Sequence, residues 1–158
     1  MFHQSQSLCL TENFVPPTYP KMIVIGDDCP NVSFGNKKSY KAVNQRSPFS
    51  YRNNLANEMK AKFPNRIPVI VERASNEQVF LNLDTDKFLV PENISYFHFA
   101  ALSRSRLNIR NHQPFCISVN KMCLKSIFKG AQGNQLMGDM YRENPDDDGF
   151  LYFVYSSS

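Results

Sequence analysis

The stretch RIPVIVER, residues 66–73, decides the fold of this chain. It is a run of mainly β-branched residues with turn-forming residues on both sides, PN before it and ASNE after it. An apolar run of this length is typical of a strand at the centre of a sheet that is covered on both faces. Because side chains alternate along a strand, Val69 and Val71 are expected on one face and Ile70 on the other.

A helix is predicted directly before this strand. Ser50 can cap a helix that runs to about Lys62, because a serine oxygen can accept a hydrogen bond from a backbone N–H of the first turn. Apolar residues at intervals of four form one narrow stripe on this helix: Leu55, Met59 and Phe63. A shorter helical turn is expected around Tyr40 to Gln45, so two helices precede the central strand.

The segment ENISYFHFAALSRSRLN predicts a third, long helix. Ser95 is a natural N-cap, and Ile94 before it can pack onto Phe99, four positions into the helix. Phe99, Leu102 and Leu107 mark the side of the helix that would be buried. We therefore expect this helix to pack across the sheet.

Three further strands are expected. KFLVP, residues 87–91, predicts a short strand in which Leu89 and Val90 point to opposite faces. Pro91 keeps the far end from joining a continuous ladder, which indicates an edge strand with unpaired backbone groups. The other two strands are PFCISVN, with alternating Phe115, Ile117 and Val119, and GFLYFVYS near the end of the chain.

The order of elements is helix, helix, strand, strand, helix, strand, an irregular stretch and strand. The irregular stretch, Asn120 to Tyr141, is expected to hold a short strand and a short helix. One long helix that crosses a mixed sheet indicates an α+β domain, and the ubiquitin-like β-grasp architecture fits the order best. This domain is expected to span residues 38–158. Residues 1–37 are expected to form an irregular extension with a short strand at Met22 to Ile25.

Composition and charge limit the possible functions. The chain has 158 residues, of which 42% are hydrophobic, enough for one well-buried domain. The net charge of +4 is unevenly spread, since residues 38–73 carry eight basic residues against two acidic ones. Such a segment can attract nucleic acid, an anionic membrane or an acidic protein. The first residues do not have the pattern of a signal peptide, so none is expected, and the longest aliphatic runs are too short to span a bilayer.

No catalytic or metal-binding constellation is evident. His3, His98 and His112 are scattered, without a carboxylate or cysteine at triad or ligand spacing. Nucleotide-binding glycine motifs and a nucleophile elbow are missing. The consecutive acids Asp146 to Asp148 lack the alternate spacing of a calcium site and are expected to form a solvated turn. No C-x-x-C pair occurs, so the cysteines are expected to be reduced thiols of a cytosolic protein: Cys9, Cys29, Cys116 and Cys123.

Three blocks of this sequence resemble one known family. They are KFPNRIPVIVER, LDTDKFLVPENI and DDDGFLYFVYSSS, and the family is the ubiquitin-like modifiers of autophagy, represented by microtubule-associated protein light chain 3 and the GABA receptor-associated protein. The blocks occur in the family's order and at nearly its spacing, from about Ser39 to Ser158. The light chain 3 branch is the more similar one, because of the GFLYFVY ending and the basic first helices. The resemblance implies a β-grasp domain with two additional N-terminal helices, no enzymatic activity and no cofactor.

The resemblance also implies peptide binding. Family members bind short peptides of the form aromatic-x-x-Leu/Ile/Val, which lie as an added strand along the second strand of the sheet. By position, the aromatic-binding pocket would be lined by Met59, Pro68, Ile70, Lys87, Leu89 and Phe150. The aliphatic-binding pocket would be lined by Phe88, Val90, Pro91, Phe99, Leu102 and Arg106. Arg46 and Arg66, near the rim, would select acidic residues that flank the motif. Residues 1–37 contain no aromatic residue followed at the third place by Leu, Ile or Val, which argues against their docking in this groove.

Partners and location follow from the same resemblance. The implied partners are autophagy receptors and adaptors that carry such motifs, the enzymes of a ubiquitin-like conjugation cascade, and a processing cysteine protease. Family members are joined to phosphatidylethanolamine through a glycine a few residues after the last strand, and this sequence stops at Ser158, before that position. The implied location is the cytoplasm, with association to the autophagosome membrane when lipid-linked. The form without lipid is expected to be soluble, because a patch of surface charge attracts a membrane only weakly.

Three positions depart from the family pattern, and three alternatives stay open. Leu55 stands where light chain 3 members tend to have an acid, Thr85 replaces a usual lysine, and Ser105 replaces an arginine of a basic run. The first alternative is an interaction module that is never conjugated. The second is a nucleic-acid binder that uses the basic segment with three stacking groups: Phe49, Tyr51 and Phe63. The third is a hydrolase or oxidoreductase that uses Cys116 or Cys123. No specific nucleic acid is expected as a partner.

Overall fold

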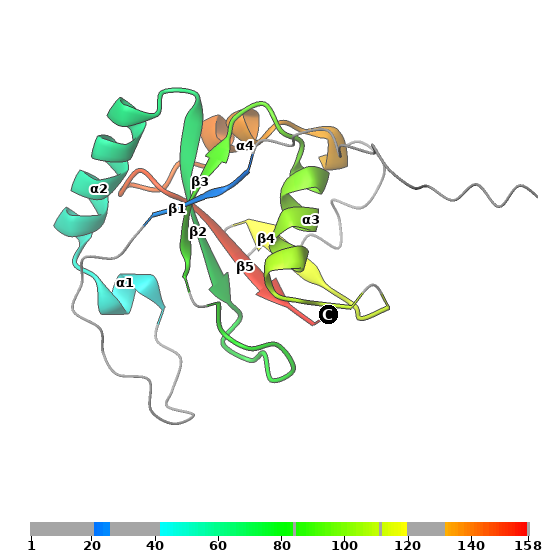
Figure 1. Ribbon diagram of the computed structural model, residues 1–158. Coiled ribbons are helices and arrows are strands. Elements are labelled where there is room, and N and C mark those ends of the chain that lie inside the picture. The colour runs from blue at the N-terminus through cyan, green and yellow to red at the C-terminus, as the bar shows by residue number, and fades with distance from the viewer. Residues whose placement is uncertain (1–20, 26–41, 84, 111, 120–131, 158) are drawn as a thin grey trace, which may run out of the picture.

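The computed structural model describes residues 21–25, 42–83, 85–110, 112–119 and 132–157. Its elements, in chain order, are β1 (Ile23–Val24), α1 (Val43–Arg46), α2 (Phe49–Lys62), β2 (Arg66–Arg73), β3 (Lys87–Pro91), α3 (Tyr96–Arg106), β4 (Cys116–Val119), a 3-10 helix (Gln132–Asn134), α4 (Met137–Glu143) and β5 (Leu151–Ser156). The strands form one mixed sheet in the order β1-β3-β2-β5-β4. Figure 1 shows this sheet between α1 and α2 on one side and α3 on the other.

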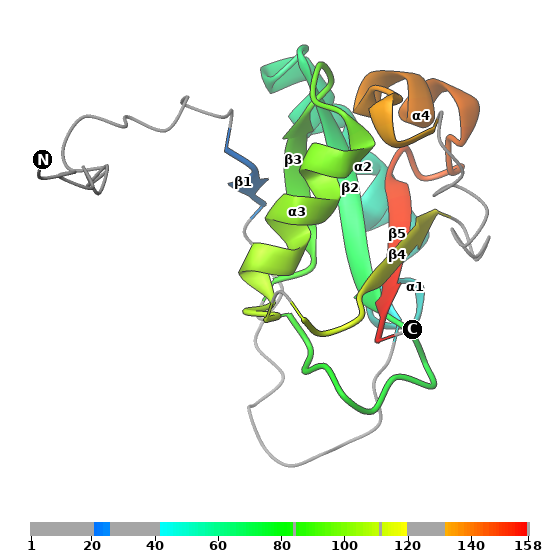
Figure 2. The ribbon, with the colours of Figure 1, turned by 90° about the vertical axis from the view of Figure 1, so that its right-hand side faces the viewer.

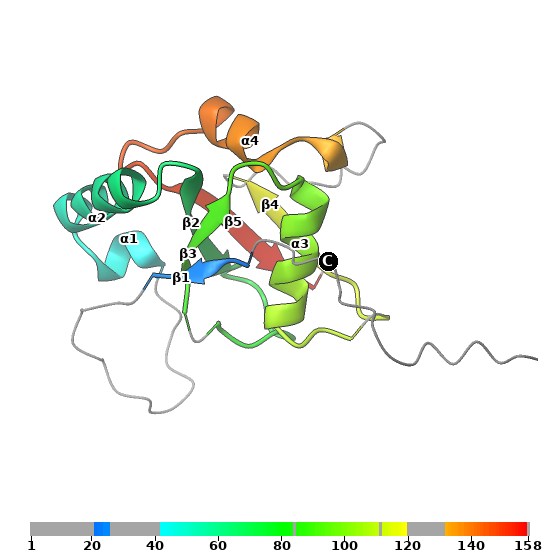
Figure 3. The same cartoon turned by 45° about the horizontal axis from the view of Figure 1, so that its top comes forward.

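Two apolar cores cover the two faces of the sheet. The α3-side core is the larger one and includes Phe88, Val90, Phe99 and Phe153. The α2-side core consists of six buried residues: Ile25, Val43, Ala56, Ile70, Leu89 and Phe150. The view in Figure 3 separates the two layers, with α1 and α2 on one side of the strands and α3 on the other. Strand β3 contributes to both cores, because its side chains alternate between the faces as predicted.

Strand β2 is the centre of the sheet, as its sequence predicted. It pairs antiparallel with β3 and parallel with β5. Val69 and Val71 lie in the α3-side core and Ile70 lies in the α2-side core. All three side chains are at most 1% exposed, so the apolar run in RIPVIVER is explained by cover on both faces.

Strand β3 is not the edge strand that its sequence indicated. Strand β1 pairs with it antiparallel, with Ile23 opposite Leu89 and Val24 opposite Phe88. Pro91 does not prevent this pairing, because it lies beyond the last pair, at the far end of β3. Figure 2 shows β1 along the outer side of β3.

Strand β1 also corrects one expectation and confirms another. A short strand was expected at Met22 to Ile25, and the structure places it at Ile23–Val24. The expectation that residues 1–37 would not dock on KFLVP is wrong for residues 21–25. It relied on aromatic anchors, whereas the anchors that the structure shows are the aliphatic side chains of Met22 and Ile25, both buried.

The start of α2 differs from its prediction. The helix begins at Phe49 with Pro48 in the N-cap position, and no side chain caps it, so the predicted Ser50 cap is wrong. Pro48 has no side-chain oxygen that could accept a hydrogen bond, and its backbone is extended rather than helical. Helix α1 covers Val43–Arg46; the expected turn began at Tyr40, and residues 40 and 41 lie outside the described residues.

The buried side of α2 also differs from the predicted stripe. The residues that α2 buries are Arg52 and Ala56, while Leu55 and Met59 are half-buried against the α2-side core. Phe63 is 37% exposed, because the helix ends before it and its backbone turns away. The arginine was not expected in the interior, and its burial depends on an acidic partner described below.

Helix α3 follows its prediction closely. Ser95 caps it, since the backbone N–H of His98 donates to the Ser95 Oγ at 3.2 Å. Ile94 and Phe99 both lie in the α3-side core, and Leu102 and Leu107 pack against that core. Within the described residues, no helix has both the length and the apolar character that crossing a membrane requires.

The C-terminal half completes the sheet. Strand β5 lies between β2 and β4, so the apolar GFLYFVYS run is an interior strand, as predicted. In β4, Ile117 and Val119 are buried, and Phe115 packs against the same core from the preceding loop. The predicted short helix near Tyr141 is α4. The short strand expected in the same stretch is not found between residues 132 and 141, and residues 120–131 lie outside the described residues.

The acidic turn before β5 is only partly solvated, which corrects another expectation. Asp148 is completely buried. Its carboxylate accepts hydrogen bonds from the Arg52 Nε at 2.7 Å, the Tyr152 hydroxyl at 2.5 Å and the Phe150 N–H at 3.0 Å. Burial and the neighbouring carboxylate raise the pKa of Tyr152 well above its usual range, so the hydroxyl stays a donor. The charge of Asp148 can be buried because Arg52 matches it.

Candidate peptide-binding site

The residues assigned to the aromatic-binding pocket come together on the α2 side of β3. Ile70, Leu89 and Phe150 belong to the α2-side core, and Met59 of α2 packs against it. Pro68 lies opposite Leu89, and Lys87 lies opposite Ile70, in the ladder between β2 and β3. Cross-strand partners share a face of the sheet, so these two also face α2. All six except the half-buried Met59 are buried.

The residues assigned to the aliphatic-binding pocket gather between β3 and α3. Phe88, Val90 and Phe99 belong to the α3-side core, and Leu102 packs against it. The guanidinium carbon of Arg106, near the end of α3, lies 5.3 Å from the centroid of the Phe88 ring. Pro91 is the buried last residue of β3, where the chain leaves the sheet toward α3.

A strand added beside β3 can reach both groups of residues. Side chains three positions apart in an extended strand point to opposite faces of a sheet. A residue opposite Leu89 faces the α2 side, and a residue opposite Phe88 faces the α3 side. A segment with apolar residues at its first and fourth positions can therefore place one in each core. That spacing is the one found in the aromatic-x-x-aliphatic motif.

In this structure the chain itself fills both positions. Ile25 is part of the α2-side core and is 5% exposed, while Met22 is part of the α3-side core and is 8% exposed. Between them, Ile23 and Val24 are 38% and 40% exposed. The segment Lys21–Ile25, which we call the strap, thus makes the pair of contacts that the family resemblance assigns to a bound peptide.

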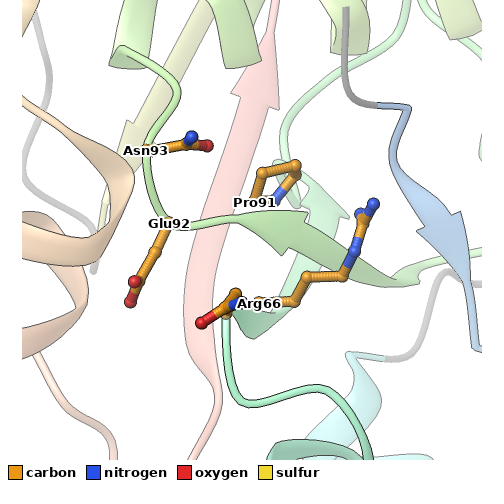
Figure 4. Close-up of a pocket in the computed structure, with 5 residues that line it drawn as sticks. Arg66, Pro91, Glu92 and Asn93 are labelled. Carbon is orange, nitrogen blue, oxygen red and sulfur yellow. The ribbon is translucent and has the colours of Figure 1, made fainter.

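Arg66, one of the two predicted rim residues, holds the strap. Its Nη1 donates to the carbonyl oxygen of Lys21 at 2.8 Å and approaches that of Leu89 at 3.5 Å. Figure 4 shows the Arg66 side chain extended toward β1. A polar depression of about 380 Å³ opens at this end of β3; its lining residues are Asn65, Arg66, Pro91, Glu92 and Asn93.

Arg46, the other predicted rim residue, belongs to a network of charges at the opposite end of β3. It forms an ion pair with Asp86, and the Lys87 Nζ lies 3.3 Å from the other oxygen of the same carboxylate. The N–H of Val43 donates to the Glu72 carboxylate at 2.6 Å. Burial raises the pKa of Glu72, and this hydrogen bond opposes the increase only in part. An incoming acidic group would therefore compete with Asp86 for these cations.

The three departures from the family pattern lie around the same surface. Leu55 packs against the α2-side core, so it makes an apolar contact at the position where the resemblance implies an acid. Thr85 is half-buried just before β3, and Ser105 is exposed on α3. The chain therefore carries no charge at these three positions.

Of the residues assigned to the alternative functions, Phe49 and Tyr51 lie on α2, and Phe63 directly follows it. Phe49 and Phe63 are exposed, but the Arg52 guanidinium beside the Phe49 ring is taken up by Asp148. Cys116 is half-buried in β4, and Cys123 lies outside the described residues. Within the part of the chain that the structure describes, no three histidine, cysteine or carboxylate side chains gather in a way that could hold a metal ion.

Sequence patterns did not point to Met22 and Ile25 as residues of the site. The run MIVI did carry a signal, since it places two aliphatic residues three positions apart in an extended segment. The partnership of Arg52 with Asp148 left no local signal, because the two residues are 96 positions apart.

Comparisons with known proteins agree with this fold. The family model described as "Autophagy protein Atg8 ubiquitin like" matches residues 51–158. Human microtubule-associated protein 1 light chain 3 gamma is 36% identical over 119 residues, which cover 75% of this chain and 77% of that protein. Protein lgg-2 of Caenorhabditis elegans is 34% identical over 113 residues, which cover 72% of this chain and 82% of that protein.

Solved structures give the same result. Plasmodium falciparum Atg8 in complex with a Plasmodium falciparum Atg3 peptide aligns with a TM-score of 0.65 and 27% identity, over 75% of this chain and 98% of that chain. Trypanosoma brucei ATG8 aligns with a TM-score of 0.63 and 28% identity, over 74% of this chain and 95% of that chain. The family and the α+β, ubiquitin-like fold class expected from the sequence are confirmed. The chain belongs to the Atg8 family of ubiquitin-like autophagy proteins.

Proposed function

We propose that this protein is a non-enzymatic modifier that recruits autophagy receptors and adaptors by binding aromatic-x-x-Leu/Ile/Val peptides along β3. The observation that carries the proposal is the strand position beside β3, from which residues three apart reach one core on each face. The Atg3 peptide bound to the P. falciparum relative supports peptide binding in this family. A sequence without a catalytic motif favours a binding module over an enzyme.

The aromatic anchor would take the place of Ile25, among Met59, Ile70 and Leu89 on the α2 side. The aliphatic anchor would take the place of Met22, near Phe88 and Val90. Because an aromatic ring is larger than the isoleucine side chain, α2 would have to shift slightly or Met59 change rotamer to admit it. The side chain of Met59 is flexible, so it can make this adjustment at little cost.

The order of the two anchors sets the direction of the peptide. The strap runs antiparallel to β3, so that Ile25 lies beside Lys87 and Met22 lies toward Pro91. In the peptide motif the aromatic residue comes first, and the α2-side position near Lys87 is the one assigned to it. The peptide would therefore start near Lys87 and run parallel to β3. Roughly micromolar affinity is expected, because two buried anchors and a short ladder must offset the ordering of the peptide.

Lipid conjugation is the second part of the proposed function. A form that continues beyond Ser158 to a glycine would be a substrate of a ubiquitin-like conjugation cascade and would be joined to phosphatidylethanolamine. The Atg3 peptide complex of the relative supports conjugation enzymes as partners. Two buried acyl chains anchor a protein firmly, since each methylene contributes about 0.8 kcal/mol. The protein would then move from the cytoplasm to the autophagosome membrane. Mass spectrometry of the native protein would show the lipid adduct, whereas an unmodified C-terminus under starvation would indicate an interaction module that is never conjugated.

Peptide binding is tested by titrating a fluorescent peptide with an aromatic-x-x-leucine core, preceded and followed by acidic residues, and measuring anisotropy. The double variant Leu89→Arg/Lys87→Ala should weaken binding more than about tenfold, because it places a charge in the α2-side position. The matched control is Leu81→Arg/Lys62→Ala, since Leu81 is 83% exposed and Lys62 lies on the outer side of α2.

A milder variant separates binding from folding. Met59→Ala truncates a half-buried side chain that lines the α2-side position. It should weaken peptide binding, while the melting temperature stays close to that of the wild type. Equal affinity of the wild type, the Leu89→Arg/Lys87→Ala variant and the Met59→Ala variant would rule out this site.

A further inference from the structure

We propose that the strap, Lys21–Ile25, is a built-in competitor that occupies the peptide groove and must be displaced before a peptide can bind. The inference rests on the proposed peptide-binding function and adds its regulation. Both ligands need the outer backbone groups of β3, and these groups can pair with only one strand at a time. A peptide would therefore bind only if its binding free energy is large enough to displace the strap.

The backbone of the strap already uses the edge that a peptide needs. Ile23 and Val24 are in register with Leu89 and Phe88. The Ile25 N–H donates to the Lys87 carbonyl oxygen at 3.0 Å. At the other end, the Lys21 carbonyl oxygen accepts from Arg66 Nη1 at 2.8 Å. The strap therefore pairs with β3 from Lys87 to Leu89, and Arg66 of β2 holds its other end.

The side chains of the strap imitate the two anchors of a peptide. Met22 and Ile25 are three apart and are buried in opposite cores, whereas the residues between them are more than one third exposed. The order is reversed relative to the peptide motif, because the strap is antiparallel to β3 and its first anchor enters the α3-side core. Neither anchor is aromatic, so the strap fills the groove with smaller groups than a cognate peptide would.

Arg66 can form a hydrogen bond both when the strap occupies the groove and when a peptide occupies it. With the strap in place, its guanidinium is bound to the Lys21 carbonyl oxygen, and Figure 4 shows it directed toward β1. Because the peptide would run parallel to β3, the residues after its aliphatic anchor would lie near Pro91, and an acidic residue there could pair with the same guanidinium once the strap leaves. A charge-assisted hydrogen bond to a carboxylate is stronger than one to a backbone carbonyl. A peptide with an acidic residue after its aliphatic anchor would thus displace the strap more readily than one with a neutral residue there.

The competition is intramolecular, because the strap belongs to the same chain as the groove. An intramolecular ligand can act at an effective concentration on the order of 1 mM. A strap with an intrinsic dissociation constant of about 0.1 mM would then occupy the groove roughly 90% of the time. The apparent affinity for a peptide would be about tenfold weaker than that of an empty groove.

Two double variants of the full chain test the proposal with the same fluorescent peptide. Met22→Ser/Ile25→Ser removes both anchors and keeps every backbone N–H. The matched control, Ile23→Ser/Val24→Ser, makes the same change at the two exposed positions. The first should bind the peptide about tenfold more tightly than the wild type, a difference of about 1.4 kcal/mol. The control should change the affinity by less than about threefold.

Amide hydrogen exchange at Ile25 supplies an independent readout. In the free chain this N–H should be protected by its bond to Lys87, and a saturating peptide should remove the protection. Two results would refute the competitor role of the strap without refuting peptide binding. One is an unchanged peptide affinity of Met22→Ser/Ile25→Ser, and the other is protection of the Ile25 N–H that persists when the peptide is bound. If no variant binds the peptide although Ile25 is protected, then the proposed function fails, and the competitor role fails with it.

Discussion

Replacing Asp148 by alanine should be among the most damaging single changes in this protein. The carboxylate is completely buried and accepts from three donors, of which the Arg52 Nε at 2.7 Å carries a charge. The Arg52 side chain is only 9% exposed. Without its partner, the guanidinium would keep the hydrogen bond of Nη1 to the Ser47 carbonyl oxygen and its contact with the Phe49 ring, and it would remain away from water. Breaking a buried pair by removal of one partner costs about 3 to 5 kcal/mol.

That cost is large relative to the total stability of a domain, which is about 5 to 15 kcal/mol. It corresponds to a decrease in melting temperature on the order of 10 °C for a chain of this size. Urea unfolding followed by circular dichroism measures the loss, and Asp147→Ala is the matched control, because Asp147 is an exposed neighbour of the same charge. The control should change the free energy of unfolding by less than about 0.5 kcal/mol. A loss below about 1 kcal/mol for Asp148→Ala would refute the idea that the buried pair fastens α2 to the start of β5.

Three further predictions concern the fold that carries the site. Burial by itself raises the pKa of Glu77. The backbone N–H groups of Phe80, Ser157 and Val79 donate to its carboxylate, and these three hydrogen bonds bring the pKa below its usual value of 4.5. The ionised carboxylate therefore stabilises the fold above that pH, and the stabilisation is lost as the pH falls through the lowered pKa. Glu77→Gln should melt below the wild type at pH 7, and the difference in melting temperature should disappear as the pH falls through the lowered pKa; a difference that persists in acid contradicts this. Ser95→Ala, which removes the α3 cap, should cost about 0.5 to 2 kcal/mol in urea unfolding, and an unchanged midpoint would show that the cap is dispensable. Phe153→Ala should cost about 3 to 5 kcal/mol by the same measurement, because the fully buried ring lies 4.6 Å from the ring of Phe99; a loss under 1 kcal/mol would mean that the core refills the space.

The features that could be predicted from the sequence are those with a local pattern. The alternation of Val69, Ile70 and Val71 follows from the two-residue period of a strand, and the Ser95 cap follows from a serine placed directly before an apolar periodicity. The interior position of GFLYFVYS follows from its apolar character. Each of these depends on neighbours within a few residues, which the sequence displays directly.

The features that could not be predicted depend on distant partners. Asp148 looked solvated because its neighbours are acids, whereas its burial is decided by Arg52 on another element. KFLVP looked like an edge because of Pro91, whereas its outer side is covered by a strand more than sixty residues earlier in the chain. Such pairings are set by tertiary packing, which overrides local propensity.

In the candidate site, too, some features could be predicted from the sequence and others could not. The twelve pocket residues came from the family resemblance, and the structure brings them together around β3, while their role in peptide binding stays a prediction. The rim residues Arg46 and Arg66 already have partners within the chain. The occupation of the groove by Met22 and Ile25 could be found only in three dimensions, because burial of the two side chains depends on both cores being within reach of one short segment.

A crystal structure of the full chain with a bound aromatic-x-x-leucine peptide is the most direct test of the groove. We expect the peptide to lie parallel to β3, with the aromatic side chain among Met59, Ile70 and Leu89 and with the leucine near Phe88. The strap should be absent from the edge, and Arg66 should contact the peptide instead of Lys21. A peptide bound elsewhere, with Ile23 still opposite Leu89, would contradict both the location of the site and the role of the strap.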